Sequence, residues 1–548
     1  MDQETTESYN YLNPTIGDGS PAGSLSRGNV ILKSYTFNQF LNYNKSWGPH
    51  NMEAMAGHEN NSRQTVSSST TVRGQIAPGN KLELSNYTTI SEAPASSTVE
   101  KHVEGYLSRI NYDYSNIYYL SGMVRRDGNS LFDASKRWAN FWSLSGGWRI
   151  SKEDFFNSRI IKDLKLKASY GKVGNDAVGN YVYQSGYIVN NNAQEPGYIY
   201  GLIANKNLTW ESLNNLNVGM EFSLLKGRIT ADIEFYNKVS SGLIFAVPQP
   251  VSGGGTPDGA FSVWQNIGSM YNRGVELTLN TEIIRGRMFT WDLTLNAATL
   301  KNRITKMPAS NKEIISGTKK LSEGHSIYDY WLLSWKGVDP TNGDALYELD
   351  EKNTYQENAP YDYPDKTING VKYTTSSSRA KYNYQGSAIP DLYGSVRSDM
   401  RYKNFSLNLL LTYQIGGMAY DGVYANLMSP SFGYAISKDI TKRWQHTGDQ
   451  TNVPRIDFGR GADFGGSSNR WLINATSLTV NNINFGYTFN GAALQRLRLS
   501  GLQTYLSVEN AYQFSARKGM NVLQSFNGTT GDLYIPRRVY SLGVIANL

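Results

Sequence analysis

Apolar and polar residues alternate with a period of two along much of the chain. Over residues 405–415, the odd-numbered positions from Phe405 to Ile415 are apolar or aromatic, and all but Leu410 of the residues between them are polar. Residues 229–236, 275–280 and 289–298 show the same alternation. Because successive side chains of a strand point to opposite faces, each stretch predicts a strand with one apolar and one polar face.

The spacing of these stretches also follows a pattern, because short and long connections alternate along the chain. Short turns are expected at 47–49, 114–116, 151–162, 226–227, 285–287, 402–404 and 490–491. Long connections are expected over 60–99, 127–137, 175–210, 242–266, 302–390, 417–474 and 511–533. Several stretches reach the roughly 9–11 residues that a transmembrane strand needs. Short turns at one rim and long loops at the other are typical of outer-membrane β-barrels.

The turns predict seven hairpins, and a last strand over 534–548 brings the expected number to fifteen. The apolar positions expected on one face of this last strand are Tyr540, Leu542, Val544, Ala546 and Leu548. Single-chain bacterial barrels have even strand numbers. Residues 1–33 are therefore interpreted as the remnant of an extracellular loop, and the chain is expected to start inside a loop of a larger barrel.

Composition narrows the class of protein. Hydrophobic residues make up 39% and charged residues 18% of the 548 residues, below the roughly 45–50% and 25% of ordinary globular domains. Aromatic residues at 12% exclude intrinsic disorder. No stretch approaches 18 consecutive apolar residues, which excludes a helical membrane protein. The absence of cysteine excludes disulfides and zinc–thiolate sites.

The net charge of +7 is spread along the chain, and the basic residues form no run longer than a pair such as Arg125-Arg126. Nucleic-acid binding is therefore not expected, because it requires a concentrated basic patch. The N-terminus, Met1-Asp2-Gln3-Glu4, has neither the basic nor the apolar region of a secretory signal.

Candidate chemistry is sparse. The five histidines show no metal-ligand spacing, and no GxSxG motif is present. Strand carboxylates such as Asp232 and Glu276 are interpreted as polar groups that line a water-filled lumen. We therefore expect no catalytic residue, no metal and no cofactor. Aromatic residues in or beside the long connections are candidate substrate contacts, or else belong to an interfacial girdle or to packing within the loops. They are Tyr198, Tyr200, Trp264, Tyr328, Trp331 and Trp335.

An ordered series of motifs resembles the SusC/RagA family of TonB-dependent outer-membrane transporters. The pair IYYLSGMVRRDGNSLF (117–132) and WANFWSLSGGWRISKEDFF (138–156) is the most distinctive. The other matching segments are 166–175, 205–211, 235–245, 266–280, 337–347, 402–417 and the final RRVYSLGV from residue 537. The similarity extends over nearly the whole chain from about residue 34.

The resemblance implies an all-β, antiparallel transmembrane barrel of about 22 strands in the outer membrane of a Gram-negative bacterium. It implies import of glycans or oligopeptides, with a SusD-like surface lipoprotein as partner, outer-membrane lipid around the barrel, and a TonB complex acting through a plug domain. The signal peptide, the plug and about seven earlier strands of the family have no counterpart here. Residues 34–548 are thus expected to be the C-terminal part of the barrel, with long extracellular loops.

Two alternatives remain open from the sequence. A soluble, secreted all-β protein that binds or degrades polysaccharide would also be rich in aromatics, alternation and glycine-containing turns. The chain could also be a non-functional, truncated piece of a transporter. Strand length, the short–long order of the connections and the motif series favour the transporter over the soluble protein.

Overall fold

The computed structural model describes most of the chain. The described residues are 2–10, 23–77, 82–192, 195–249, 252, 255–256, 259–309, 311–352, 365–368, 370–430, 436–457, 460–489, 494, 499–517, 528–531 and 536–547.

Antiparallel β-structure dominates. Strands of the principal sheet are β1 (Asp2–Asn10), β2 (Ser24–Trp47), β3 (His50–Gln75), β4 (Tyr87–Tyr114), β5 (Tyr118–Asn129), β6 (Trp138–Arg149), β7 (Ile161–Asn175), β10 (Glu211–Leu224), β11 (Ile229–Pro248), β14 (Ser262–Arg285), β15 (Phe289–Ala298), β16 (Lys301–Lys306), β25 (Leu392–Tyr402), β26 (Phe405–Ile415), β29 (Ser477–Phe489), β30 (Gly501–Ser515) and β31 (Val539–Asn547).

The connections contain shorter elements. Their strands are β8 (Gly186–Asn192), β9 (Glu195–Leu202), β12 (Gly255–Thr256), β13 (Gly259–Ala260), β17 (Glu313–Ser316), β18 (Lys319–Ser322), β19 (Asp329–Leu333), β20 (Trp335–Val338), β21 (Ala345–Glu348), β22 (Lys366–Ile368), β23 (Val371–Thr374), β24 (Tyr382–Ser387), β27 (Met418–Tyr420) and β28 (Leu472–Asn474). The helices are α1 (Gly422–Leu427) and α2 (Gly461–Gly465), with 3-10 turns at Leu84–Asn86, Ile150–Lys152, Leu225–Gly227, Ser377–Arg379, Lys438–Lys442 and Asn469–Trp471. Within the described ranges, no helix has the length and apolarity needed to cross a bilayer.

The chain divides into two compact units, each formed from several segments. Unit 1 comprises Met1–Gly146, Ser169–Asn214 and Ser240–Ile267, and unit 2 comprises Gly147–Ala168, Asn215–Val239 and Gly268–Leu548.

In unit 1, β1 to β5 pair antiparallel in sequence order. Strands β2, β3 and β4 are 24, 26 and 28 residues long, well beyond the 9–11 of a single membrane crossing. Part of this length, residues 60–75 of β3, has polar side chains on both faces. Its backbone is held by the ladders to β2 and β4.

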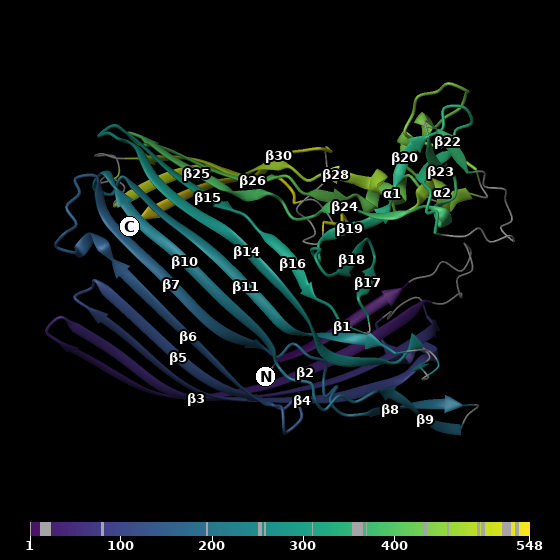
Figure 1. The fold of residues 1–548 in the computed structure, drawn as a ribbon, viewed down its shortest axis with the longest axis horizontal. Helices are drawn as coiled ribbons and strands as arrows, with labels where there is room; N and C mark the ends of the chain where they lie inside the picture. The colour runs from purple at the N-terminus through teal and green to yellow at the C-terminus, as the bar shows by residue number, and fades with distance from the viewer. Residues whose placement is uncertain are drawn as a thin grey trace. The chain divides into compact units, whose positions relative to one another are not determined.

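The connections after β5 and after β7 in unit 1 share a small core. Phe132, Val182 and Leu208 are buried together, and Trp210 packs against this cluster. Strands β8 and β9 of the connection after β7 form a hairpin (Figure 1).

In unit 2, the register of β15, β25, β26, β29, β30 and β31 aligns apolar and polar residues in separate rows. One row of directly paired residues is Trp291, Met400, Leu407, Phe485, Leu506 and Leu542. The adjacent row is Asp292, Asp399, Asn408, Asn484, Ser507 and Ser541. Neighbouring rows point to opposite faces, so this part of the sheet has one apolar and one polar face. The apolar face is open, with Phe485, Leu506 and Leu542 46%, 47% and 82% exposed.

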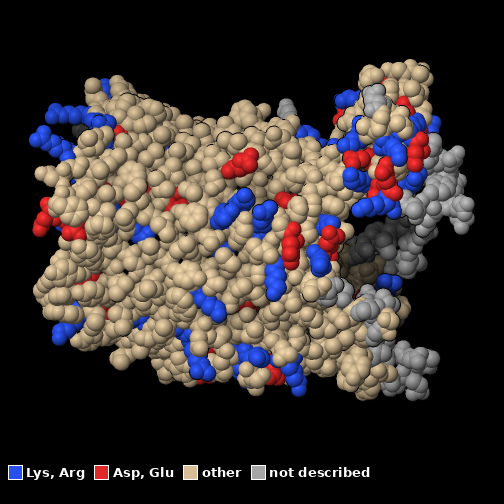
Figure 2. All heavy atoms as spheres, viewed as in Figure 1, with Lys and Arg blue, Asp and Glu red and all other residues tan. Residues whose placement is uncertain are grey.

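The described residues within 307–391 and 416–476 of unit 2 fold together into what we call the loop domain. It contains the four-stranded sheets β17–β18–β19–β24 and β20–β21–β23–β22 and both α-helices (Figure 1). One core gathers around Tyr330, Met428 and Trp471, and a second around Trp335 and Tyr347. Figure 2 shows Lys, Arg, Asp and Glu side chains close together over the part that Figure 1 labels β20 to β23.

The principal sheet has seventeen strands, compared with the fifteen expected. The first addition is β1. The second is β16, which pairs with the same strand as β15, so the two cover successive parts of β14. The other fifteen correspond to the strands predicted by the short turns. Of those turns, Asn490-Gly491 lies outside the described residues, between the end of β29 at Phe489 and the start of β30 at Gly501.

The structure corrects several expected loops. Residues 2–10 and 24–32 pair as β1 and the start of β2, instead of forming a loop over 1–33. Residues 60–75 and 87–99 are strand, although a loop was expected over 60–99. Because polar side chains occupy both faces there, the sequence shows no apolar–polar alternation. The strands form nevertheless, because backbone hydrogen bonds to neighbouring strands do not depend on this alternation. The extracellular location of residues 1–33 stays a prediction.

Candidate functional site

A cavity of about 500 Å³ lies in unit 2 between the polar face of the sheet and the connections. Tyr393 of β25, Thr412 and Gln414 of β26, and Ser477 and Asn481 of β29 line it from the sheet. The period-two alternation places Thr412 and Gln414 on the polar face of their strand. Tyr393 pairs directly with Gln414, which pairs with Ser477.

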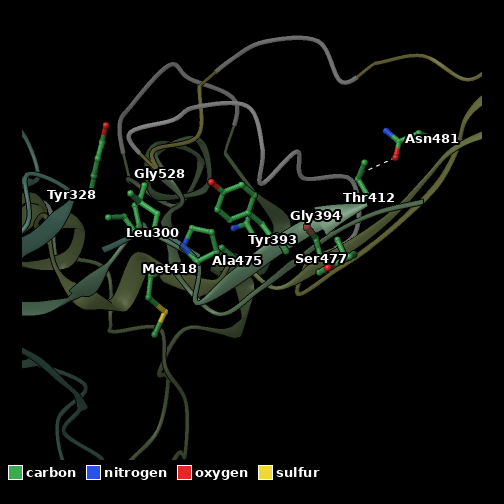
Figure 3. A pocket seen from close by; sticks show the side chains of 15 residues that line it. Leu300, Tyr328, Tyr393, Gly394, Thr412, Met418, Ala475, Ser477, Asn481 and Gly528 are labelled. Carbon is green, nitrogen blue, oxygen red and sulfur yellow. Dashed lines mark hydrogen bonds between the residues drawn. The ribbon is translucent and has the colours of Figure 1, made fainter. Parts of the chain in front are cut away.

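Gly394 of β25 and Tyr413 of β26 complete the lining from the sheet, and the connections supply the rest. Their lining residues are Leu300, Tyr328, Ala388, Ile389, Pro390, Met418, Ala475 and Gly528. Figure 3 shows Tyr328 at one end of the lining, and the hydrogen bond from Thr412 Oγ1 to Asn481 Oδ1, 2.7 Å long, at the other. The site therefore combines apolar walls with a few polar groups, which is typical of small-molecule sites.

Tyr330 holds the connections together behind the cavity. It is fully buried, and its hydroxyl lies 3.1 Å from the carbonyl oxygen of Met418 and 2.6 Å from that of Gly528. Gly528 has a φ of +73°, and a Cβ there would overlap Tyr330 Oη and Ala388 Cβ. Only glycine fits this left-handed, crowded position. The wall of the cavity is thus fixed by contacts between segments far apart in the sequence.

Lys319 of β18 is the basic group next to this wall. Its Nζ donates to the carbonyl oxygen of Tyr328 at 2.7 Å and lies 3.1 Å from the ring centroid of Tyr330. Burial lowers the pKa of Lys319 to about 7, although Asp329 acts in the opposite direction. Burial also raises the pKa of Tyr328. Both effects arise because a partly dehydrated environment disfavours the charged form.

The sequence-predicted aromatics do not form one site. Tyr328 lines the cavity. Trp331 makes an edge contact with Tyr384, with Lys320 4.0 Å from its ring centroid.

The other predicted aromatics lie elsewhere. Trp335 is buried against Tyr347 in the second core of the loop domain. In unit 1, Trp264 packs against the small core, and Tyr198 and Tyr200 are exposed on β9. Substrate contact by any of the six stays a prediction.

Sequence reasoning missed the lining residues on the sheet. Thr412 and Gln414 were recognised only as polar-face residues, and Tyr393, Ser477 and Asn481 were not singled out. Tyr393 carried a usable signal, because it is an aromatic residue at a polar-face position of its strand. Within the described ranges, no three His, Asp or Glu side chains come together in a way that could hold a metal ion.

The last strand carries the predicted apolar face. Tyr540, Leu542 and Val544 are 65%, 82% and 65% exposed along β31. Leu542 pairs with Leu506 and Tyr540 with Val508 of β30. Leu548 lies outside the described residues.

Comparison with known proteins matches residues 2–427 to the family model described as TonB dependent receptor-like, beta-barrel. TonB-dependent receptor P3 of Formosa agariphila is 27% identical over 533 residues, which cover 94% of this chain and 51% of that protein. TonB-dependent receptor SusC of Bacteroides thetaiotaomicron is 30% identical over 430 residues, covering 76% of this chain and 41% of SusC.

Among solved structures, the RagAB peptide transporter superposes with a TM-score of 0.83 at 23% identity, covering 99% of this chain and 58% of that one. The chain spans about half the length of the curated relatives it matches. The predicted fold class is confirmed, and so is the SusC/RagA resemblance. These relatives are described as receptors and a transporter, in agreement with the prediction that the chain is not an enzyme. The chain therefore belongs to the TonB-dependent receptor β-barrel family.

Proposed function

We propose that this chain forms barrel wall and external loops of an outer-membrane importer that takes up a glycan or an oligopeptide. Its partners would be a SusD-like surface lipoprotein and a TonB complex that acts through the plug domain of the family. The names of two relatives support this reading, because one is SusC and the other is a peptide transporter.

The observation that carries the proposal is the pair of rows across six strands of unit 2. An exposed apolar row suits contact with lipid, because a bilayer replaces water around it. The adjacent polar row and the cavity share the opposite face, where a solute would be bound. A soluble polysaccharide-binding protein would instead leave Leu506 and Leu542 facing water, which the hydrophobic effect disfavours.

The test is made in the source bacterium by deleting the gene that encodes this chain. Growth is then measured on single glycans and on peptide mixtures, with a complemented strain and a strain lacking the TonB energy system as references. We expect growth on one nutrient class to be lost in both mutants and restored by complementation. Unchanged growth on every nutrient, or a protein that fractionates in buffer without detergent, would contradict the proposal.

A further inference from the structure

Among the described residues, the lining of the cavity contains no ionised side chain. None of its fifteen described lining residues is Asp, Glu, Lys, Arg or His. Further along the sheet the same face does carry charges, at Asp292 of β15 and at Arg397 and Asp399 of β25. The charged and uncharged parts of the polar face are thus separated along the strands.

We propose that this cavity binds an uncharged, hydroxyl-rich segment of the imported solute, such as neutral sugar units, and rejects ionised segments. This rests on the proposed import function and adds the chemical class that the site selects.

Two charged groups close to the cavity, Lys319 and Arg517, are already engaged, whereas Asp391, between the lining residues Pro390 and Tyr393, is exposed beside Gly416. Lys319 donates to Tyr328 from behind the wall. Arg517 Nη1 lies 2.6 Å from Asp421 Oδ2, next to Tyr420. Glu276 faces the same side as Tyr393, but Ala298 of β15 lies between them in the pairing. An anionic ligand in the cavity would therefore lose water without gaining a counter-charge, and burying an unpaired charge is costly.

Neutral hydrogen-bonding groups remain for a ligand. Thr412 uses its hydroxyl proton on Asn481, so Thr412 presents oxygen lone pairs and Asn481 presents its amide N–H groups. For the side chains of Gln414 and Ser477, the described part of the chain shows no hydrogen-bond partner. These four residues offer both donors and acceptors, as a polyhydroxylated ligand needs.

The remaining walls suit the apolar side of such a ligand. The rings of Tyr328 and Tyr393 and the side chains of Ile389, Pro390 and Met418 form broad apolar surface. A sugar ring presents C–H groups on its faces and hydroxyls at its edge, which matches aromatic walls with a few polar groups. A free oligopeptide carries two charged termini, for which the described lining offers no partner.

The test measures binding to the full chain, purified in detergent, by isothermal titration calorimetry. The probes are neutral oligosaccharides of two to four hexose units, the corresponding oligouronates, and tetra-alanine. We expect binding of at least one neutral probe, and at least about tenfold weaker binding of the oligouronate of equal length and of tetra-alanine. Equal affinity for charged and neutral probes, or no binding of any neutral probe, would overturn the proposal.

Matched variants locate the effect. Asn481→Asp introduces an ionised carboxylate of nearly the same shape into the cavity, and we expect it to weaken neutral binding about tenfold. Asn484→Asp makes the same change on the polar face of β29 outside the lining and should leave the affinity unchanged. Equal losses in both variants would also refute the assignment. Heat-modifiable electrophoretic mobility checks that each variant is folded.

Failure of this selectivity is distinguishable from failure of the import function. If charge preference is absent but gene deletion still abolishes growth, only the selectivity is wrong. If neutral probes bind selectively but growth is unaffected by deletion, the import function is wrong.

Discussion

Two polar regions of unit 2 differ in whether their polar side chains are charged and paired. The loop domain buries Asp344 among cations, whereas the cavity exposes uncharged groups of the sheet. Asp344 is 6% exposed and lies 3.1 Å from Arg455 and 3.2 Å from Arg460. Lys366 lies 3.8 Å away. These cations compensate the charge of Asp344, as a buried charge in a stable fold requires.

The cavity shows the contrasting case. In its lining, one hydrogen bond joins Thr412 and Asn481, while Gln414 and Ser477 keep bonding capacity. Unpaired neutral groups add little to folding and are ready to replace the water around a ligand. In unit 2, a concentration of charge thus marks a structural core, whereas the absence of charge marks the proposed binding site.

The largest effect should come from breaking the ionic core of the loop domain. Asp344→Asn removes the buried negative charge between Arg455 and Arg460, and Arg460, which is 13% exposed, keeps Asp463 as a carboxylate partner. We expect a loss of about 3–5 kcal/mol in the free energy of unfolding of the loop domain. Amide hydrogen exchange of β20 to β23 measures it.

The control for this variant is Glu351→Gln. Glu351 pairs with Lys372 at 3.1 Å, but both side chains are more than 60% exposed. Exposed pairs contribute about 0–1 kcal/mol. Equal destabilisation by both variants would break the distinction between compensated buried charge and surface charge.

A smaller effect is expected for the contact that joins the connections behind the cavity. Tyr330→Phe removes the hydroxyl between the carbonyls of Met418 and Gly528, at a cost of about 1–3 kcal/mol. Hydrogen exchange of residues 528–531 should become faster. Tyr384→Phe, which removes a hydroxyl bonded to Ser322, should not change that segment. Unchanged exchange in Tyr330→Phe would show that this hydroxyl does not fix the wall.

Within the cavity, a substitution should affect binding rather than folding. Tyr328→Ala is expected to weaken binding of a neutral oligosaccharide about tenfold, because it removes an aromatic wall. Titration calorimetry measures the affinity, and urea unfolding measures stability. Tyr198→Ala is the matched control, because Tyr198 is 73% exposed on β9 and lies outside the cavity. It distinguishes binding in the cavity from binding at the β8–β9 hairpin. A loss only in Tyr198→Ala would transfer the binding site to the β8–β9 hairpin.

The smallest effect is a dependence of stability on pH. Burial lowers the pKa of Lys319 from 10.5 to about 7, so the unfolded chain binds more protons than the folded chain between these values. Stability from this group therefore rises as pH increases from 7 towards 10.5. We expect a contribution on the order of 1 kcal/mol, after allowance for the solvent-screened part of the side chain.

Lys319→Met tests the sign of this contribution. Urea unfolding of the wild type and the variant at pH 6.5 and 9 gives the difference in pH dependence, which isolates Lys319 from other titrating groups. A shallower rise with pH in the variant is expected. An identical or steeper rise would show that Lys319 keeps its charge beside Tyr330.

Local patterns predicted the sheet well where one face is apolar. In β26, alternation from Phe405 to Ile415 identified the strand, and its short turn at 402–404 identified the partner. Prediction failed over residues 60–75, because Asn, Ser and Thr occupy both faces there. The strand persists because its backbone bonds to β2 and β4, and such bonds leave no mark in the side-chain sequence.

Local sequence patterns could not predict the cavity, because its residues are far apart in the chain. Thr412 and Asn481 are 69 residues apart, and Tyr330 and Gly528 are 198 apart. The aromatic segment 328–335 was recognised, yet its members have different roles: Tyr328 lines the cavity, while Trp335 packs in a core. Nothing in the segment itself distinguishes these positions.

The sequence by itself determined the antiparallel strands, their two faces, most of their turns and the family, because these depend on residues close together in the chain. Only the tertiary structure decided which polar-face residues meet the connections and which aromatics remain accessible. The physical reason is that alternation orients a side chain relative to its own strand. Its neighbours across space depend on how long connections fold back, and these are fixed by distant contacts such as that between Tyr330 and Gly528.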